Sequence, residues 1–94
     1  MKFRYQLPEK WISIVSRMEE FANGGAQVSV RLRDKRRFGG ILVSNSAYVV
    51  AMRGHKDLPF NLEEIEEIYQ TDEDRNPKNR SGWDFWDDWN EGKA

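Results

Sequence analysis

The sequence predicts a mainly β protein with helices, of the α+β class: an N-terminal amphipathic helix, a five-stranded small antiparallel barrel and a short C-terminal amphipathic helix after a polar linker. Three observations lead to this prediction. The spacing of apolar residues changes from a period near 3.6 to a period of two after Asn23-Gly24-Gly25. Several short alternating segments then follow one another, separated by turn residues. With 94 residues, 38% of them hydrophobic, the chain has enough apolar surface for one modest core. We therefore expect a domain over residues 1–71, a linker over 72–80 and an acidic aromatic tail over 81–94.

The first expected element is an amphipathic helix over residues 8–22. Pro8 lies in its first turn, where the missing N–H of proline is tolerated, and Asn23-Gly24-Gly25 is a strong stop signal. At 100° per residue the apolar side chains share one face of the helix, and they are Trp11, Ile14, Val15, Met18, Phe21 and Ala22. We expect this face to cover the core of the domain.

Three strands of a meander are expected next, over residues 27–33, 38–44 and 47–53. In the first, Val28, Val30 and Leu32 alternate with polar residues, which indicates a half-buried strand with a basic outer face. The second contains Gly39-Gly40, and glycines inside a strand indicate a sharp bend or a bulge. Asn45-Ser46 is expected to form a two-residue turn. The third strand is apolar on both faces, so we expect the first helix to cover it.

The rest of the domain is expected to close the barrel. Residues 58–60 are short and contain Pro59, so they fit only an edge strand. Asn61 is placed to cap one helical or 3₁₀ turn over 62–65, and residues 67–71 have the composition of a closing strand. Residues 71–80 contain no apolar side chain and are expected to form a solvated linker.

This order of elements resembles the small five-stranded barrels of the Sm-like and Src-homology-type superfolds over residues 8–71. The resemblance rests on an N-terminal helix followed by Val28, Val30 and Leu32, and then by Phe38, Gly40 and Leu42. It is a resemblance of spacing, and it implies the fold alone. Barrels of this kind serve RNA binding, protein docking and chromatin reading.

The charges are sorted along the chain. Residues 1–60 hold eleven Lys/Arg against five Asp/Glu, whereas residues 61–94 hold four against eleven and carry three of the four tryptophans. Oppositely charged parts of one molecule either fold onto each other or bind separate partners. We therefore expect a basic body and an acidic, aromatic tail.

The tail contains a second candidate helix. Ser81 and Asp84 have the spacing of a capping box, and Gly92 lies where such a helix would end. On the helical wheel the aromatic residues fall on one side, and they are Trp83, Phe85, Trp86 and Trp89. The acids fall on the other, and they are Asp84, Asp87, Asp88 and Glu91.

A helix of about ten residues is marginal in water, so this one has to dock, either on its own barrel or in the groove of a partner. The favoured function is accordingly a small non-catalytic protein-interaction domain with an adaptor or regulatory role, whose partner is an unknown protein. Its candidate protein-binding residues are Trp83, Phe85, Trp86, Trp89, Asp84, Asp87 and Asp88.

Single-stranded RNA is the alternative partner, bound by a basic hairpin and modulated by the acidic tail. Its candidate residues are Arg31, Arg33, Lys35, Arg36, Arg37, Arg53 and Lys56. Base stacking would use Tyr48 or Tyr69. Attraction to the tail or to the carboxylates of residues 63–67 explains the same basic residues without RNA, and the pI near 5.8 argues against plain nucleic-acid binding.

An enzyme is not expected. His55 is the only histidine and there is no cysteine, so nucleophilic catalysis and thiolate metal sites lack their usual groups. No cofactor motif or dedicated metal site is expected: Gly39-Gly40 lacks the lysine and hydroxyl of a phosphate loop. The longest apolar runs are far shorter than a membrane span, so we expect a cytoplasmic protein with no membrane partner. We expect a monomer or a small homo-oligomer, because the short edge strand with Pro59 is poorly suited to pairing with other chains.

Overall fold

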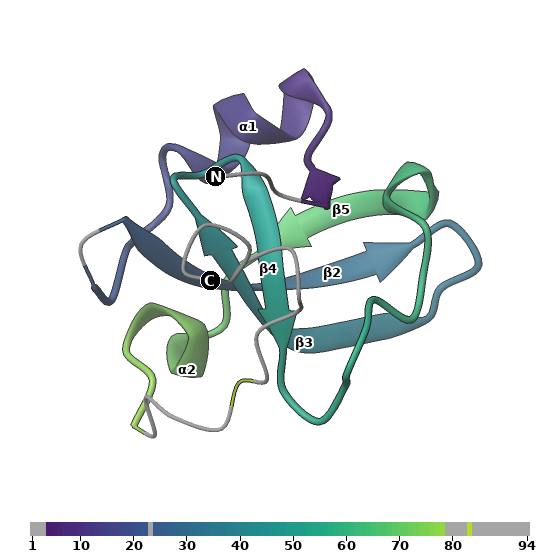
Figure 1. The fold of residues 1–94 in the computed structure, drawn as a ribbon. Coiled ribbons are helices and arrows are strands. Elements are labelled where there is room, and N and C mark those ends of the chain that lie inside the picture. The colour runs from purple at the N-terminus through teal and green to yellow at the C-terminus, as the bar shows by residue number, and fades with distance from the viewer. Residues whose placement is uncertain (1–3, 23, 79–82, 84–94) are drawn as a thin grey trace, which may run out of the picture.

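A computed structural model of the chain describes residues 4–22, 24–78 and 83. The chain forms a curled, five-stranded antiparallel sheet with short helices, which confirms the α+β class (Figure 1). In chain order the elements are β1 (Tyr5–Gln6), α1 (Glu9–Val15), β2 (Gly25–Leu32), β3 (Arg37–Ser44), β4 (Tyr48–Met52), the 3₁₀ helix η1 (Leu62–Glu64), β5 (Ile65–Tyr69) and α2 (Asp72–Arg75). The strand order across the sheet is β1-β4-β3-β2-β5.

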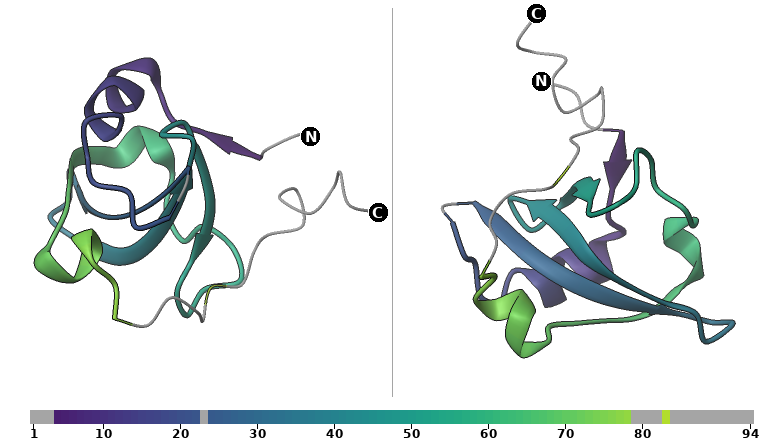
Figure 2. Two further views of the ribbon diagram at one scale, coloured as in Figure 1. Left: turned by 90° about the vertical axis from the view of Figure 1, so that its left-hand side faces the viewer. Right: turned by 90° about the horizontal axis from the view of Figure 1, so that it is seen from below.

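The meander of β2, β3 and β4 confirms the three central strands to within two residues at each end. Asn45 and Ser46, with φ of 54° and 62°, form the two-residue turn between β3 and β4. The glycine pair in β3 forms a bulge, because Val28 pairs with Ile41 and Val30 with Phe38, so two glycines stand opposite Ser29 alone. The sheet curls strongly, with α1 above it and α2 below it in the left-hand view of Figure 2.

The main core lies inside the curl. It is a cluster of buried apolar residues from β2, β3, β4, β5, α1 and the loops, among them Trp11, Val28, Leu32, Ile41 and Ile68. Leu42, between Ile41 and Val43, belongs to a second, smaller cluster with Val50 and Ala51. Successive residues of a regular strand point to opposite faces, so Leu42 and its pairing partner Ala51 lie on the outer face of β3 and β4. Val50 joins them because Val43 pairs with Val49, which makes Val50 an extra residue at a bulge in β4.

The first helix is shorter than expected. It starts at Glu9, with Pro8 as its N-cap residue instead of in its first turn, and it ends at Val15 instead of Ala22. Directly after Val15 the helical bonds give way to tighter ones, in which the N–H groups of Arg17 and Met18 donate three residues back, to Ile14 and Val15. Further on, the N–H groups of Phe21 and Ala22 donate to the carbonyl of Gly25, and Phe21 packs on the outer cluster instead of the main core.

The edge strand was predicted wrongly. Residues 58–60 do not join the sheet; the N-terminal β1 takes that edge, pairing Tyr5 with Val49 and Gln6 with Tyr48. Pro59 has no N–H to offer a ladder, and the N–H of Leu58 is bonded to the Asp57 carboxylate at 2.8 Å. The residues before Pro8 are extended because proline disfavours a helical conformation in its predecessor.

The segment after β4 otherwise follows the prediction. Asn61 caps η1 with its side chain, and Glu64 bonds back to the N–H of Asn61. The closing strand starts at Ile65, two residues earlier than expected, and buries Ile65 and Ile68 against the main core.

The polar segment after β5 is partly ordered by a second capping box. The Thr71 hydroxyl accepts a hydrogen bond from the N–H of Asp74, and the Asp74 carboxylate accepts one from the N–H of Thr71. These bonds start α2, which packs against β2, so residues 72–75 are not the solvated linker that their composition suggested. The helix that is expected in the tail over residues 81–94 lies outside the described residues except for Trp83. Among the helices that are described, none has the length and apolar content to cross a membrane.

Candidate functional site

The one described member of the aromatic tail, Trp83, is docked on the outer face of the sheet. Its indole packs against the cluster of Leu42, Val50 and Ala51 and is half-buried there. We call the surrounding surface the indole seat, defined by Phe21, Gly40, Leu42, Tyr48, Val50, Ala51 and Arg53.

Three directed contacts hold the indole in this seat. Its ring stacks on Phe21, with centroids 5.3 Å apart and planes inclined by 17°. The guanidinium carbon of Arg53 lies 4.0 Å from the ring centroid, a short cation–π contact. The indole Nε1–H donates a hydrogen bond to the Gly40 carbonyl at 3.1 Å. The seat therefore satisfies the apolar surface, the π face and the single polar atom of a tryptophan side chain.

The glycine bulge of β3 builds the polar end of the seat. Gly40 has φ of 66°, and its carbonyl accepts from both the Arg53 N–H at 3.0 Å and the indole of Trp83. A β carbon at Gly40 would lie 3.1–3.3 Å from the Arg53 side chain. The missing side chain therefore leaves the space through which Arg53 crosses Gly40 toward the indole.

The chain that leads to Trp83 is anchored by buried polar contacts. Asp74 is 2% exposed, and its carboxylate accepts bonds from Gln27 Nε2 and Ser29 Oγ, both at 2.7 Å. Glu73 accepts from Gln27 Nε2 at 2.9 Å and from the N–H of Lys78 at 3.1 Å. The approach to the seat is thus fixed to β2 as far as Lys78.

Of the predicted protein-binding residues, only Trp83 falls within the described residues. Its role in docking was predicted, but Phe21, Gly40 and Arg53 were not predicted as its partners. The glycine pair was the signal that the sequence offered for this site, because it marked an irregular strand. The other six lie outside the part of the chain that the structure describes, and they are Asp84, Phe85, Trp86, Asp87, Asp88 and Trp89.

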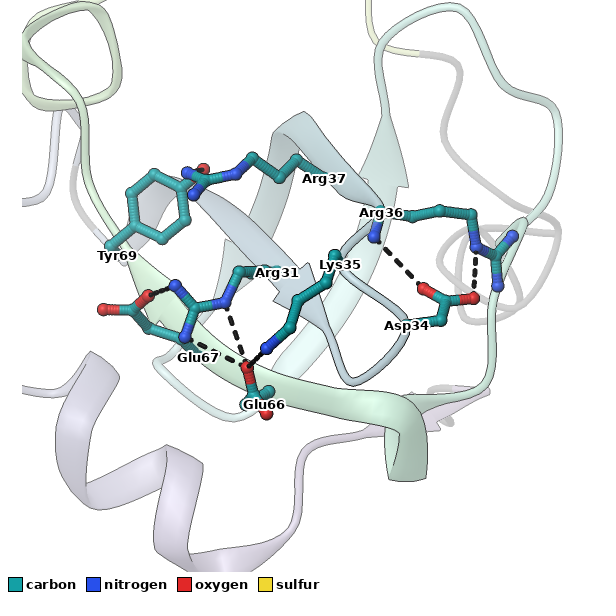
Figure 3. Close-up of polar contacts among 8 residues, drawn as sticks. All are labelled: Arg31, Asp34, Lys35, Arg36, Arg37, Glu66, Glu67 and Tyr69. Carbon is teal, nitrogen blue, oxygen red and sulfur yellow. Dashed lines mark hydrogen bonds and ion pairs between the residues drawn. The ribbon is translucent and has the colours of Figure 1, made fainter.

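The basic hairpin is largely paired with carboxylates of its own chain (Figure 3). Arg31 contacts both Glu66 and Glu67 at 3.0 Å, and Lys35 contacts Glu66 at 3.2 Å. The hydrogen bond from Lys35, its charge and then the contacts of Arg31 hold the pKa of Glu66 below its ordinary value. The pairs are partly exposed, so they neutralise charge more than they stabilise the fold.

The tip of the hairpin is paired in the same way. Arg36 contacts Asp34 at 2.7 Å and Glu64 at 3.4 Å. The backbone N–H of Arg36 is the main cause of the lowered pKa of Asp34. Arg37 donates to the Tyr69 hydroxyl at 3.3 Å and its guanidinium lies 5.8 Å from that ring (Figure 3). Tyr69 is therefore occupied by an arginine on the face that base stacking would need.

The other members of the predicted RNA-binding set do not gather on the hairpin network. Arg53 belongs to the indole seat, and Lys56 is exposed in the loop after β4. Arg33 is exposed, and it forms no ion pair with any residue in the described ranges. Tyr48, the other stacking candidate, packs against the outer cluster.

Sequence reasoning missed a cleft beside β1. It has a volume of about 580 Å³ and lies between the N-terminal strand and the loop before η1, lined by Tyr5, Gln6, Pro8, Leu58, Pro59, Phe60, Asn61, Leu62 and Glu63. Asp57, next to this loop, accepts bonds from the Tyr5 hydroxyl at 2.7 Å and from Arg4 at 3.2 Å. No sequence signal marked it, because it depends on β1 taking the edge of the sheet.

Groups for chemistry are sparse in the described part of the molecule. His55 stands edge-on to Phe38, and its Nδ1 lies 3.1 Å from the Arg53 carbonyl. Over residues 4–22, 24–78 and 83, no three His, Cys, Asp or Glu side chains are grouped as metal ligands would be.

The fold and this site define a small curled-sheet domain with an aromatic docking surface. Compared with protein-family models, curated proteins and solved structures, the chain matches none of them.

Proposed function

We propose that the protein is a non-catalytic protein-interaction module, an adaptor or regulatory domain built on a small barrel of the Sm-like or Src-homology type. Its interaction surface is the acidic aromatic C-terminal segment together with the indole seat in which that segment docks. The observation that carries the proposal is Trp83 held on the outer face of the sheet by Phe21, Gly40 and Arg53.

The chemistry of the seat is that of a protein-binding hot spot. Tryptophan and arginine are the residues most enriched among interface anchors, and the seat combines an apolar floor with a cation and a carbonyl acceptor. The segment that follows Trp83 supplies three more aromatic residues and four acids within eight positions. Such a segment fits a partner with an apolar groove and a basic rim.

RNA binding remains the alternative, and the pairing of the hairpin weighs against it. Arg31, Lys35 and Arg36 contact carboxylates of η1, β5 and the turn itself, so an incoming phosphate would have to displace them. Protein binding is favoured because the seat already holds the kind of side chain it would recognise.

Capture of a partner from cell extract tests the proposal. Three proteins are compared: the full chain, the chain ending at Lys78, and the full chain with Phe85→Ala, Trp86→Ala and Trp89→Ala together. We expect the full chain to capture a protein that the other two lose at least about tenfold, because truncating several aromatic anchors removes well over 1.4 kcal/mol of binding free energy. Ending the chain at Lys78 keeps α2 and its bonds to β2 intact.

The matched control is Ile14→Ala, which removes an apolar side chain that is 40% exposed on α1, away from the seat. It should capture the same protein as the full chain, and all variants should unfold cooperatively in urea, as expected when the sheet domain is intact. Equal capture by the chain ending at Lys78 contradicts the proposal. Capture that depends on salt and is abolished by ribonuclease supports RNA binding instead.

A further inference from the structure

The indole seat distinguishes tryptophan from the other aromatic side chains. The Gly40 carbonyl receives the indole N–H at 3.1 Å from a position on the side of the ring, where phenylalanine has no donor and the tyrosine hydroxyl does not reach. Arg53 and Phe21 contact the ring system itself, at 4.0 Å and 5.3 Å from its centroid. Together they select a flat side chain with one donor in a fixed place.

The occupant of the seat is separable from the fold. None of the buried residues of the main core belongs to the seat, and of the two clusters in the described part of the chain Trp83 packs against the outer one. Among the described residues, the last anchored position before Trp83 is Lys78, whose N–H donates a hydrogen bond to Glu73. Departure of Trp83 would uncover the seat and leave the main core closed.

We propose that the indole seat is a tryptophan-binding site that Trp83 occupies in cis, and that a tryptophan on a segment of the partner protein takes by displacing Trp83. This inference rests on the proposed function for the existence of a partner, and it adds the chemistry of that partner and the regulation of the site. Trp83 is an internal competitor. A side chain tethered by a short linker has an effective concentration in the millimolar range, so a partner has to add contacts beyond its tryptophan to displace it.

Binding of small tryptophan probes to the full chain with Trp83→Gly tests the proposal. The probes are N-acetyltryptophanamide, its 1-methylindole analogue, which lacks the N–H donor, and N-acetylphenylalaninamide. Backbone amide shifts in ¹H–¹⁵N spectra report binding at Gly40 and Arg53. We expect N-acetyltryptophanamide to saturate in the millimolar range. The methylated and phenylalanine probes should bind at least about fivefold more weakly, because they cannot donate to the Gly40 carbonyl, which then keeps only its hydrogen bond from the Arg53 N–H.

The wild-type chain and Trp83→Phe give the second comparison, which does not depend on an emptied seat. Phenylalanine keeps the stacking on Phe21 but cannot donate to Gly40, so it is the weaker internal competitor. At equal probe concentration we expect the shifts of Gly40 and Arg53 to increase in the order wild type, Trp83→Phe, Trp83→Gly. Adding Arg53→Gln to Trp83→Gly should weaken probe binding at least about twofold, because the cation–π contact is lost.

Three results would overturn the inference: no shift at Gly40 or Arg53 up to the solubility of the probe, equal affinity for the free and methylated indoles, or equal shifts in wild type and Trp83→Phe. Sedimentation could also show that the Trp83→Gly chain forms a dimer that N-acetyltryptophanamide dissociates. In that case a second copy of the chain would occupy the seat, and the role of a different partner protein would be overturned. If the Trp83→Gly chain binds no tryptophan probe but the full chain still captures its partner, the displacement of Trp83 is refuted and the proposed function stands.

Discussion

At the scale of single residues, Gly40 has the most consequences. Its φ of 66° makes the bulge that bends β3, and its carbonyl joins the Arg53 backbone to the Trp83 indole. The left-handed conformation costs other L-residues roughly 1–2 kcal/mol. Glycine at this position therefore serves both the curl of the sheet and the polar end of the indole seat.

Gly40→Ala should lower the free energy of unfolding by about 2–3 kcal/mol. Alanine has to adopt the left-handed backbone conformation of Gly40, which costs conformational free energy. In addition, its β carbon lies 3.1 Å from the Arg53 side chain, which has to move. Urea unfolding followed by circular dichroism measures the loss. Near-ultraviolet circular dichroism should change as well, because Arg53 contacts the Trp83 ring.

Gly54→Ala is the matched control. Gly54 has nearly the same backbone, with φ of 75°, but no atom beyond its chain neighbours lies within 4 Å of the added carbon. It should cost only about 1 kcal/mol and leave the aromatic spectrum unchanged. Equal losses for the two variants would show that the contact with Arg53 adds nothing to the conformational cost.

The glycine pair also marks the limit of what single residues predict. Two glycines inside a strand predicted the bend correctly, because only local backbone geometry was needed. The same residues gave no hint that the carbonyl of Gly40 would receive the indole of Trp83, which is 43 positions away. Contacts of that separation depend on the completed sheet.

At the scale of elements, α2 shows how a capping box acts within a polar segment. Thr71 and Asp74 close the box, and the same Asp74 carboxylate then accepts bonds from Gln27 and Ser29 on β2. The composition of residues 71–80 predicted a solvated linker because it contains no apolar side chain. Buried hydrogen bonds, rather than apolar contacts, hold this helix to the sheet.

Asp74→Ala should lower the free energy of unfolding by about 2 kcal/mol. The change removes the acceptor of the Thr71 N–H, which is one half of the α2 capping box. It also leaves the Ser29 hydroxyl, in a residue that is 6% exposed, without its acceptor, and Gln27, which is 2% exposed, keeps only the Glu73 carboxylate of its two described acceptors. Urea unfolding measures the effect. Hydrogen exchange should also speed up at the N–H of Thr71, because the Asp74 carboxylate that accepts its hydrogen bond is removed.

The control for this prediction is Asp72→Ala in the same helix. The Asp72 side chain is fully exposed, and within the described ranges it forms an ion pair with Arg75, three residues on, so its loss should cost no more than about 0.5 kcal/mol. A comparable loss in both variants would mean that α2 depends on its charges in general, and not on the buried bonds of Asp74.

Elements whose signals are local were predicted well, and those decided by competition were not. The three central strands and η1 follow from alternation and from Asn61 as a cap. The identity of the edge strand depends on where distant backbone bonds form, and α1 ends where tighter bonds replace the helical ones after Val15. Phe21 lies on the expected apolar face of a helix, yet it packs on the other side of the sheet, next to the bridge of Ala22 with Gly25.

At the scale of the whole molecule, the sorting of charge along the chain is partly resolved inside the fold. The basic hairpin of β2 and β3 meets the carboxylates of η1 and β5, so Glu66 alone contacts both Arg31 and Lys35. The sequence predicted this attraction as one of two readings of the hairpin. The acids of residues 84–91 lie outside the described residues, and their attraction to a basic partner belongs to the proposed function.

Because charge and burial shift the pKa values of several groups in the folded state, the free energy of unfolding should depend on pH. The pKa of Glu66 is lowered by Lys35 and Arg31, and that of Asp57 is lowered by the Tyr5 hydroxyl, the Leu58 N–H and Arg4. The folded state therefore keeps these carboxylates ionised to a lower pH than the unfolded chain does. Their stabilisation is complete above the ordinary carboxyl range, and it is lost as the pH falls through their folded pKa values.

The alkaline side of this pH dependence is set by Tyr5. Burial, followed by the hydrogen bond to Asp57 and the charge of that carboxylate, raises the pKa of Tyr5 above its ordinary value of 10.0. The phenol is thus protonated in the folded state at a pH where the unfolded chain has begun to ionise. The contribution of Tyr5 to the stability of the fold is therefore complete below pH 10.0, and it is lost as the pH rises through the folded pKa.

We expect the urea midpoint to be highest between about pH 5 and pH 9 and to fall on both sides. Tyr5→Phe should make the urea midpoint fall less steeply at alkaline pH than in wild type, because phenylalanine has no proton to lose. It should also move the acidic fall of the midpoint to higher pH, because Asp57 loses the hydrogen bond that contributes most to its lowered pKa. Parallel midpoint curves for wild type and Tyr5→Phe from pH 9 to pH 11 would contradict the role of Tyr5. An acidic fall that is unchanged in Tyr5→Phe would show that the Tyr5 hydroxyl does not control the ionisation of Asp57.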